Sequence, residues 1–262
     1  MCGIVGIAQE SKRHRFGCDD VRRMADQIFH RGPDDDGFHD GDTVVLGMRR
    51  LSIIDLEGGH QPISNEDGTI WVVNNGEIYN FQHLRQELRD KGHRFTTHSD
   101  TEVLVHLYEE HGEAFLERLE GMFAVALWDS VRKKLIVARD RLGIKPVYYW
   151  PFGGGVAFAS EIKAFLPLPG FSPAVNPASL GDYLGIGYAV APHTIFEGVS
   201  KLEPGTYLCW DEDQFSIKRY WSMPTATDRT LSYKDWVEAV REELRRAVSD
   251  HTVSDVPIGA FL

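Results

Sequence analysis

The residue whose type and position could most directly do chemistry is Cys2, which follows the initiator Met1. Removal of Met1 would leave a residue that carries both a thiol and a free α-amine. The amine has a reference pKa of about 7.7–8.0, so a fraction of it is neutral near pH 7 and can take the thiol proton. Because the thiolate is the nucleophilic form of cysteine, this pair suits covalent catalysis. Taken alone, Cys2 could equally be a small buried residue at the start of a strand.

A second polar segment, Asn74-Asn75-Gly76-Glu77, follows an apolar run. We expect a turn there that points backbone N–H groups outward. One side-chain amide and one backbone N–H would form an oxyanion hole, in which each donor is worth about 3–4 kcal/mol in the transition state. Asn-Gly is also an ordinary turn dipeptide, so this segment alone does not establish a function.

Charged residues could hold the two ends of a free amino acid. Arg49 and Arg50 stand at the head of an expected strand, and a planar guanidinium can bind a carboxylate through two hydrogen bonds. Either arginine could instead be a solvated surface residue. Asp100 could pair with an ammonium group, although an acid in the first turn of a helix also favours the helix dipole. With Cys2 and the asparagine segment, these residues suit an amide on a free amino acid.

Composition and charge narrow the class of protein. The chain has 262 residues, of which 42% are apolar, and its net charge of -11 argues against a nucleic-acid partner. The three cysteines form no CxxC pair, which argues against a disulfide framework and a thiolate zinc site and fits a reducing compartment. No run approaches the ~18 apolar residues of a membrane span, and the N-terminus does not read as a signal peptide. We therefore expect a cytoplasmic protein without a membrane partner.

The apolar pattern predicts helices and strands in groups. Helices are expected over 19–29, after Asn80 as far as Gly92, and from the capping-box sequence Ser99-Asp100-Thr101-Glu102 to Gly112. Strands are expected at 3–8, 43–48, 51–55, 69–74, 122–129, 134–139, 147–150, 155–159 and 206–210, with a loop over 30–37. Consecutive strands with short connections indicate antiparallel sheets, so the fold class is α+β or a layered α/β/β/α arrangement.

The amino-acid composition of the chain changes near residue 212. We expect one domain over residues 2–211, a polar and irregular linker over 212–231, and a helix that begins after Ser232 and has one apolar face. The last residues, 256–262, resemble the beginning of a core strand. One helix and half a strand cannot bury a core of their own, so 232–262 is expected to be the start of a second, truncated domain.

Six spaced motifs resemble those of class II glutamine amidotransferase domains, and most closely those of glutamine-hydrolysing asparagine synthetases. They are residues 2–6 (CGIVG), 30–34 (HRGPD), 50–55 (RLSIID), 75–80 (NGEIYN), 99–102 (SDTE) and 139–146 (RDRLGIKP). The resemblance implies an N-terminal nucleophile hydrolase fold, which is a four-layer α/β/β/α sandwich of two stacked antiparallel sheets between helices.

The resemblance also implies a mechanism. Cys2 would be the nucleophile with its own α-amine as the base, and the Asn75 side chain and the Gly76 backbone would form the oxyanion hole. The thiolate would attack the side-chain amide of glutamine and release ammonia, and water would cleave the γ-glutamyl thioester to give glutamate. This step needs neither a metal nor a nucleotide.

Substrate-binding roles are implied in the same way. Arg50 would bind the α-carboxylate of glutamine, while Glu77 and Asp100 would hold its α-ammonium. The pocket would be walled by Leu51, Ser52, Ile53 and Ile54. Arg49 receives no role and is expected at the surface.

The tail, residues 254–262, resembles the stretch that precedes the ATP pyrophosphate loop of asparagine synthetases. ATP, Mg²⁺ and aspartate are therefore implied for a longer protein, in which ammonia would travel inside to an activated aspartate. Leu262 stands where the nucleotide pocket would begin and cannot form that site alone. A homodimer is also implied, because related enzymes are often dimers.

Three other interpretations stay open. The same glutaminase could feed a different acceptor, such as a phosphosugar, phosphoribosyl pyrophosphate, or a carboxylate of an antibiotic or surface polymer. The domain could instead be catalytically silent and serve regulation or assembly. It could also be an unrelated cysteine hydrolase, such as an acylase, although Arg50 and Asp100 would then grip both ends of a free amino acid without need.

Overall fold

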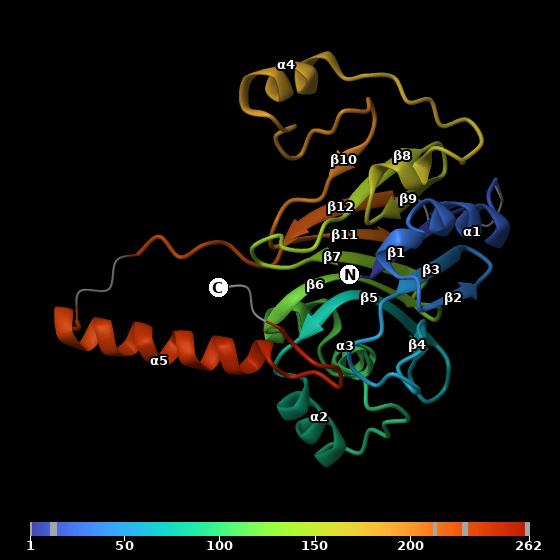
Figure 1. Ribbon diagram of the computed structural model, residues 1–262. Helices are drawn as coiled ribbons and strands as arrows, with labels where there is room; N and C mark the ends of the chain where they lie inside the picture. Colours follow the sequence, from blue (N-terminus) through green and yellow to red (C-terminus); the bar gives the residue numbers. More distant parts are fainter. Residues whose placement is uncertain (1, 11–14, 212–213, 227–229, 260–262) are drawn as a thin grey trace.

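The computed structural model describes residues 2–10, 15–211, 214–226 and 230–259, which form two stacked six-stranded sheets with helices outside them (Figure 1). The first sheet contains, in spatial order, β10 (Ser200–Lys201), β8 (Tyr148–Phe152), β9 (Gly155–Ala159), β1 (Gly3–Gln9), β3 (Val44–Arg50) and β2 (Asp35–Asp40). The second contains β12 (Gln214–Arg219), β11 (Thr206–Asp211), β7 (Lys134–Arg139), β6 (Gly121–Asp129), β5 (Ile70–Ile78) and β4 (Ile63–Ser64). Neighbouring strands pair antiparallel throughout.

Helices lie outside the two sheets. They are α1 (Cys18–Gln27), α2 (Phe81–Asp90), α3 (Val103–His111), α4 (Pro177–Ile186) and α5 (Tyr233–His251), with short 3-10 helices η1 (Phe29–Arg31), η2 (Asp100–Glu102), η3 (Gly112–Arg118) and η4 (Ile162–Phe165). Three clusters of buried apolar side chains fill the spaces between the layers. One packs the first sheet against α1, one lies between the two sheets, and one packs the second sheet against α2 and α3. The expected α+β sandwich with four layers is confirmed.

Strand β1 carries the N-terminal cysteine into the middle of this sandwich. Side chains alternate along a strand, so Ile4 and Ala8 point into the cluster between the sheets, while Val5 and Ile7 point to the α1 side. The same alternation places Cys2 on the inter-sheet side, where it packs against that cluster. β1 pairs with β9 on one side and β3 on the other, so the cysteine stands at the end of a strand that is fixed on both edges.

Two expected elements differ from the structure at the site. Residues 51–55 form no strand, because the side chain of Arg50 gathers the carbonyl groups of this segment. The expected turn at Asn74–Glu77 is also wrong. Strand β5 continues through these residues to Ile78, held by pairing with β6 in which Asn75 lies opposite Ala124.

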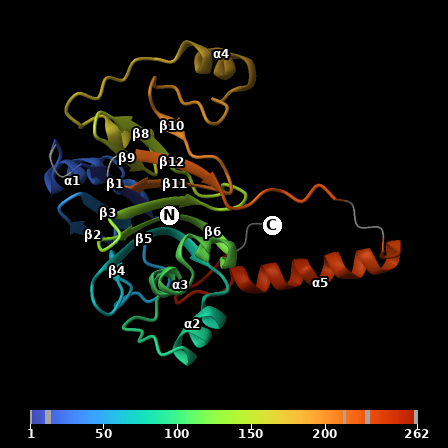
Figure 2. The same cartoon turned by 180° about the vertical axis from the view of Figure 1, so that it is seen from behind.

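The structure also contains elements that the apolar pattern does not predict. β2 begins inside the expected loop 30–37 and continues past its end. Its sequence is polar because the strand lies at the edge of the sheet, beside β3. β12, an exposed edge strand on β11, lies within 212–231, so the expectation of an irregular linker is wrong for residues 214–219. α4 follows Asn176, whose side chain caps it, and stands at the periphery of the molecule (Figure 2). Residues 256–259 form no strand, and 260–262 lie outside the described residues.

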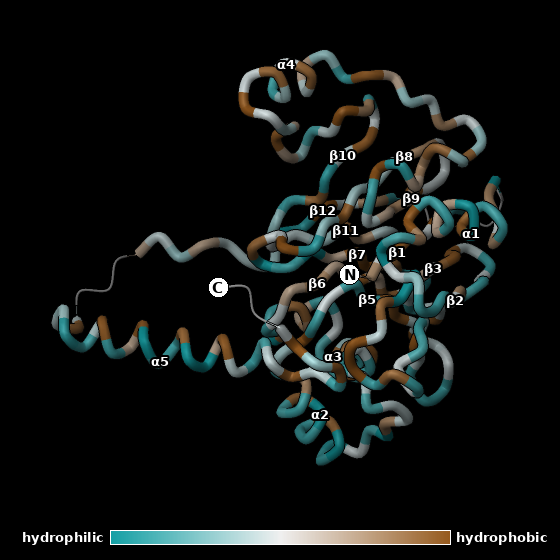
Figure 3. The backbone as a smooth tube through the Cα atoms, in the orientation of Figure 1, coloured by the Kyte–Doolittle hydropathy of each residue, from teal (hydrophilic) through white to brown (hydrophobic). Residues whose placement is uncertain are grey.

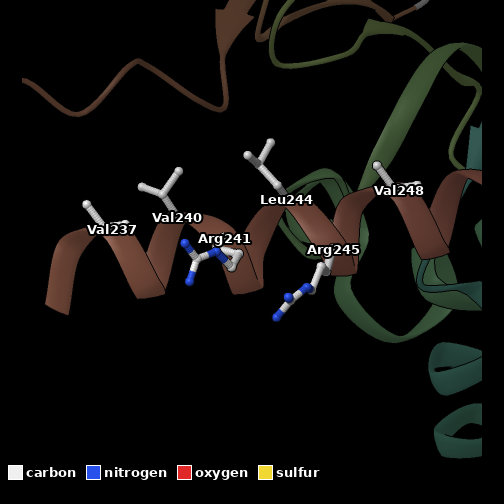
Figure 4. A pocket seen from close by; sticks show the side chains of 6 residues that line it. All are labelled: Val237, Val240, Arg241, Leu244, Arg245 and Val248. Atoms are coloured by element: carbon white, nitrogen blue, oxygen red, sulfur yellow. The ribbon is translucent and has the colours of Figure 1, made fainter. Parts of the chain in front are cut away.

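Helix α5 extends away from the sandwich (Figures 1 and 2). It begins after Ser232 as expected, and the Ser232 hydroxyl accepts a hydrogen bond from the Asp235 amide. Apolar residues recur along the helix between hydrophilic turns (Figure 3), and Val240, Leu244 and Val248 are 52%, 62% and 64% exposed (Figure 4). The division of the chain into one domain and the start of another stays a prediction. Within the described ranges, no helix combines the length and apolar character of a membrane span.

Candidate active site

One pocket brings together most of the residues expected to act on a substrate. It is lined by Cys2, Arg50, Leu51, Ile53, Ile54, Gln61, Asn74, Gly76, Glu77, Ser99, Asp100 and Thr101. Two of the expected residues do not line it. Ser52 turns its backbone amide to the Asp34 carboxylate, and Asn75 is buried beside the pocket. Leu262 lies outside the described residues, and Arg49 pairs with Asp26 and Asp36 away from the pocket, as expected for a residue without a role.

The thiol of Cys2 is held by the backbone of Leu51. Its Sγ accepts a hydrogen bond from the Leu51 amide at 3.3 Å and lies 3.5 Å from the Leu51 carbonyl oxygen. Burial raises the pKa of this thiol above its usual value, and the Leu51 amide offsets the rise only in part. The thiol is therefore protonated at neutral pH, so its action as a nucleophile needs a base.

The free edge of β5 faces the pocket with its backbone amides. Along one edge of an antiparallel strand, every second N–H points the same way. The Asn74 amide on this edge donates to Gln61 Oε1 at 2.7 Å, and the Ile78 amide donates to Asp100 Oδ2 at 2.8 Å. Gly76 lies between them in the same register, so its N–H points into the pocket.

Glycine is required at position 76 by its contact with the neighbouring strand. A Cβ atom there would lie 2.1 Å from the Met122 carbonyl oxygen and 2.6 Å from the Phe123 Cα. The absence of a side chain thus allows β5 to pair closely with β6 while its amide faces the pocket.

The Asn75 side chain lies buried beside the pocket, on the face of β5 that carries the inter-sheet cluster. Val73 belongs to the cluster between the sheets, and the alternation of side chains places Asn75 on that same face. Asn75 is 1% exposed, and its amide nitrogen and oxygen have no hydrogen-bond partner among the described residues. A buried amide without partners is costly, so a group that enters the pocket and accepts its N–H would gain a strong interaction.

Arg50 is buried in the lining of the pocket. Its Nη2 donates to the carbonyl oxygens of Ile54 at 2.9 Å and Asp55 at 2.7 Å, and its Nη1 lies 3.4 Å from that of Leu56. The segment that follows Arg50 therefore folds around its guanidinium. This arrangement puts a cation, with donors for a planar anion, at a fixed place in the pocket.

Two carboxyl groups, those of Glu77 and Asp100, also line the pocket. Burial and the neighbouring Asp100 raise the pKa of Glu77 to about 8, and burial raises the pKa of Asp100 as well. Lys145 lowers the pKa of Glu77, and its own pKa is lowered by burial. Two carboxylates in one buried site favour a cation between them, because it removes their mutual repulsion.

Several residues of the pocket were not identified from the sequence. The side-chain amide of Gln61 pairs with the backbone of β5. Its Oε1 accepts from the Asn74 N–H, and its Nε2 lies 3.4 Å from both the Asn74 carbonyl oxygen and Thr101 Oγ1. Ser99 and Thr101 direct hydroxyl groups to Asp100 Oδ1, each at 3.4 Å. Ser99 and Thr101 belong to the SDTE motif at residues 99–102, whereas Gln61 belongs to none of the six motifs.

The sandwich of two antiparallel sheets with a cysteine at the start of a central strand has the arrangement of the N-terminal nucleophile hydrolase fold. The chain belongs to the glutamine amidotransferase family, whose model, described as "Glutamine amidotransferase domain", matches residues 1–221. A structure of glutamine phosphoribosylpyrophosphate (PRPP) amidotransferase from B. subtilis shares the fold, with a TM-score of 0.60 at 23% identity over 85% of this chain and 50% of that one.

Curated relatives are more similar in sequence. The chain is 40% identical, over its whole length, to asparagine synthetase [glutamine-hydrolyzing] 3 of Bacillus subtilis, of which it covers 43%. It is 39% identical to amidase chry2 of Gibberella zeae, over 93% of this chain and 37% of that protein. The chain thus spans less than half the length of these relatives.

Proposed function

We propose that this domain hydrolyses the side-chain amide of glutamine with Cys2 as the nucleophile. One observation carries the proposal. The Cys2 thiol lies at a pocket into which the free amide of Gly76 points, and the Arg50 guanidinium and the Glu77 and Asp100 carboxyls line the same pocket. A free amino acid carries the complementary charges at its α-carbon, and its side chain would then extend toward the thiol.

The steps follow from this placement. With Met1 removed, the α-amine of Cys2 takes the thiol proton, and the thiolate adds to the amide carbon of glutamine. The oxygen, now negative, accepts hydrogen bonds from the Gly76 N–H and the Asn75 side chain. The C–N bond breaks as the ammonium of Cys2 protonates the nitrogen, which leaves as ammonia. Water then adds to the thioester, and the C–S bond breaks to give glutamate and the thiol.

We propose that no metal or nucleotide takes part in this step, because donors and base all come from the chain. A reducing compartment keeps the Cys2 thiol free, so we place the domain in the cytoplasm. The ammonia would pass to an acceptor held by the remainder of the protein. Aspartate, activated by ATP with Mg²⁺, is the acceptor that we propose from the similarity to asparagine synthetase 3 of B. subtilis.

The exposed apolar face of α5 supports the existence of such a remainder. Val240, Leu244 and Val248 form a stripe that a larger domain would cover (Figure 4). We also propose a homodimer for the whole protein, which sedimentation would test.

A second acceptor follows from the other relative. Amidase chry2 is as similar to this chain as the asparagine synthetases, with 39% identity, and its name assigns no aspartate. A glutaminase that serves another carboxylate is therefore the alternative. Product analysis of the full-length protein with aspartate and ATP separates the two, because only the first yields asparagine.

The glutaminase itself is tested by glutamate release from glutamine. The chain is compared with a Cys2→Ala variant, with intact mass to verify that Met1 is absent from both. We expect turnover in the first and none in the second. A Cys18→Ala variant is the matched control, because this half-buried cysteine lies on α1. Turnover that survives Cys2→Ala, or a folded, processed full-length protein without turnover, would contradict the proposal.

A further inference from the structure

Four side chains that could bind a metal converge at a place apart from the glutamine pocket. Glu66 comes from the connection between β4 and β5, His93 follows the end of α2, and His106 and Glu109 lie three residues apart on α3. One ligand atom from each lies within 4.8 Å of those of the others. None of the four lines the glutamine pocket, and none belongs to the motifs that identify the family.

We propose that this cluster binds one divalent transition-metal ion, with zinc as the reference case. The Nδ1 atom of His106 lies 3.0 Å from Glu109 Oε2 and 3.5 Å from Glu66 Oε2. The Nδ1 atom of His93 lies 3.5 Å from Glu109 Oε2 and 3.7 Å from Glu66 Oε1. Zinc bonds of about 2.0–2.2 Å place the ligands of a tetrahedral ion about 3.4 Å apart, and these four separations lie between 3.0 and 3.7 Å.

The groups around three of the four ligands also fit a metal site. Ligands in such sites are held by a second set of hydrogen bonds. Glu109 Oε1 accepts from the Asn65 side chain at 2.9 Å, and Glu66 Oε1 accepts from the Arg94 amide at 2.9 Å. The far nitrogen of His93 contacts the Glu110 carboxylate at 3.2 Å, which Lys91 holds in turn at 2.8 Å.

Charge favours an ion over a purely ionic network of these side chains. The two carboxylates lie beside a fully buried imidazole, since His106 is 0% exposed and its ring centroid lies 4.8 Å from that of His93. Charge that is buried in this way needs a compensating partner. A divalent ion with two neutral imidazoles and two carboxylates is balanced.

The ion would join three elements that support the glutamine pocket. It would tie the connection before β5 and the end of α2 to α3, whose preceding turn η2 carries Asp100. Its expected role is therefore structural, and its removal should lower the thermal stability of the protein.

The test uses the chain without a histidine tag, after treatment with a chelator and buffer exchange. Zinc is titrated by calorimetry, bound metal is counted by mass spectrometry, and the melting temperature is recorded with and without zinc. We expect one saturable equivalent per chain, release of protons on binding, and a higher melting temperature. The Glu110→Gln variant, which keeps all four ligands, should weaken binding about 10–100-fold.

The ligand variant combines Glu66→Gln with His93→Gln, because neither residue lies in the apolar core. This double variant should no longer bind the one equivalent of zinc. The control variant His111→Gln, at the end of α3 and outside the cluster, should still bind it. Cobalt in place of zinc gives a probe that needs no variant. A tetrahedral nitrogen and oxygen site shows visible bands without a thiolate charge-transfer band. Absence of a saturable equivalent, a thiolate band, or binding that survives the double variant would overturn the proposal.

Discussion

Glu77 is the residue whose protonation should govern substrate binding. Its pKa of about 8, raised by burial and by Asp100, means that the empty site holds a neutral carboxyl at pH 6. An ammonium needs the ionised form, so glutamine binding must release this proton. We expect the Kd of glutamine for the Cys2→Ala variant to fall about tenfold per pH unit between pH 6 and pH 7.5 and to level off above pH 8.

Calorimetry over this pH range measures the effect, with Glu77→Gln in the same background as the comparison. That variant should bind more weakly and lose most of the pH dependence. A parent protein whose Kd is flat from pH 6 to pH 8 would remove Glu77 from this role.

Lys145 should tune the same equilibrium. This buried lysine lowers the pKa of Glu77, so its replacement by the apolar Lys145→Met should raise that pKa further. The pH at which glutamine binding levels off would then move upward. Lys163→Met, a change of an exposed lysine that pairs with Glu161, is the control and should leave the profile unchanged.

At the scale of single residues, the sequence predicted which residues line the pocket better than it predicted the residues that support them. Arg50, Glu77 and Asp100 stand in motifs, and the structure gathers them with Cys2 around one pocket, although their roles stay predictions. Gln61 could not be predicted, because its function as a partner for the edge of β5 depends on a fold that joins distant segments. The cluster of Glu66, His93, His106 and Glu109 could not be predicted for the same reason. Only His106 and Glu109 have helical spacing, and the other two residues come from separate segments.

At the scale of elements, β5 positions the oxyanion donors through its close pairing with β6. Gly76→Ala would push a methyl group against the Met122 carbonyl, so we expect a loss of about 1–3 kcal/mol in the free energy of unfolding, together with a lower kcat. Chemical denaturation and glutamate release measure the two effects.

Gly153→Ala provides a matched control. Nothing lies within 4 Å of a Cβ at this position, so the free energy of unfolding should change by less than about 0.5 kcal/mol. Equal losses in the two variants would show that position 76 has no special requirement for glycine.

Elements with a strong apolar alternation or a clear helix signal could be predicted from the sequence. β6 and β7 are buried along most of their length, and α2 ends at Asp90, with Lys91 as its C-cap and Gly92 at φ +104° behind it. The failures have physical causes. Residues 51–55 are apolar enough for a strand but wrap around a guanidinium, and β12 is an exposed edge whose stability comes from β11.

At the scale of the whole molecule, the C-terminal segment touches the glutamine pocket from outside. The Asp255 amide donates to the Ile53 carbonyl oxygen at 3.0 Å, and the Asp55 amide donates to Asp255 Oδ2 at 2.7 Å. Nearby, the Tyr79 hydroxyl and His251 Nε2 are 2.8 Å apart. A segment expected to begin the second domain is thus bonded to the loop that surrounds Arg50.

Loss of this contact should weaken glutamine binding. Asp255→Ala removes one acceptor from the loop, and a hydrogen bond worth about 0.5–1.5 kcal/mol corresponds to a two- to tenfold rise in KM. Steady-state kinetics of the full-length protein measures it, with Glu242→Ala on the exposed side of α5 as the control. An unchanged KM in Asp255→Ala would show that the tail merely rests on the loop.

The way Arg50 is held has a consequence for the many simple carboxylic acids that a cell contains. In the empty pocket both N–H groups of Nη2 are already occupied by the carbonyl oxygens of Ile54 and Asp55. An anion must displace them, and a simple acid has no ammonium to offer the Glu77 and Asp100 carboxyls in return. Acetate, succinate and similar acids would break these hydrogen bonds and gain only the attraction to Arg50. Metabolic acids should therefore leave the site open to amino acids.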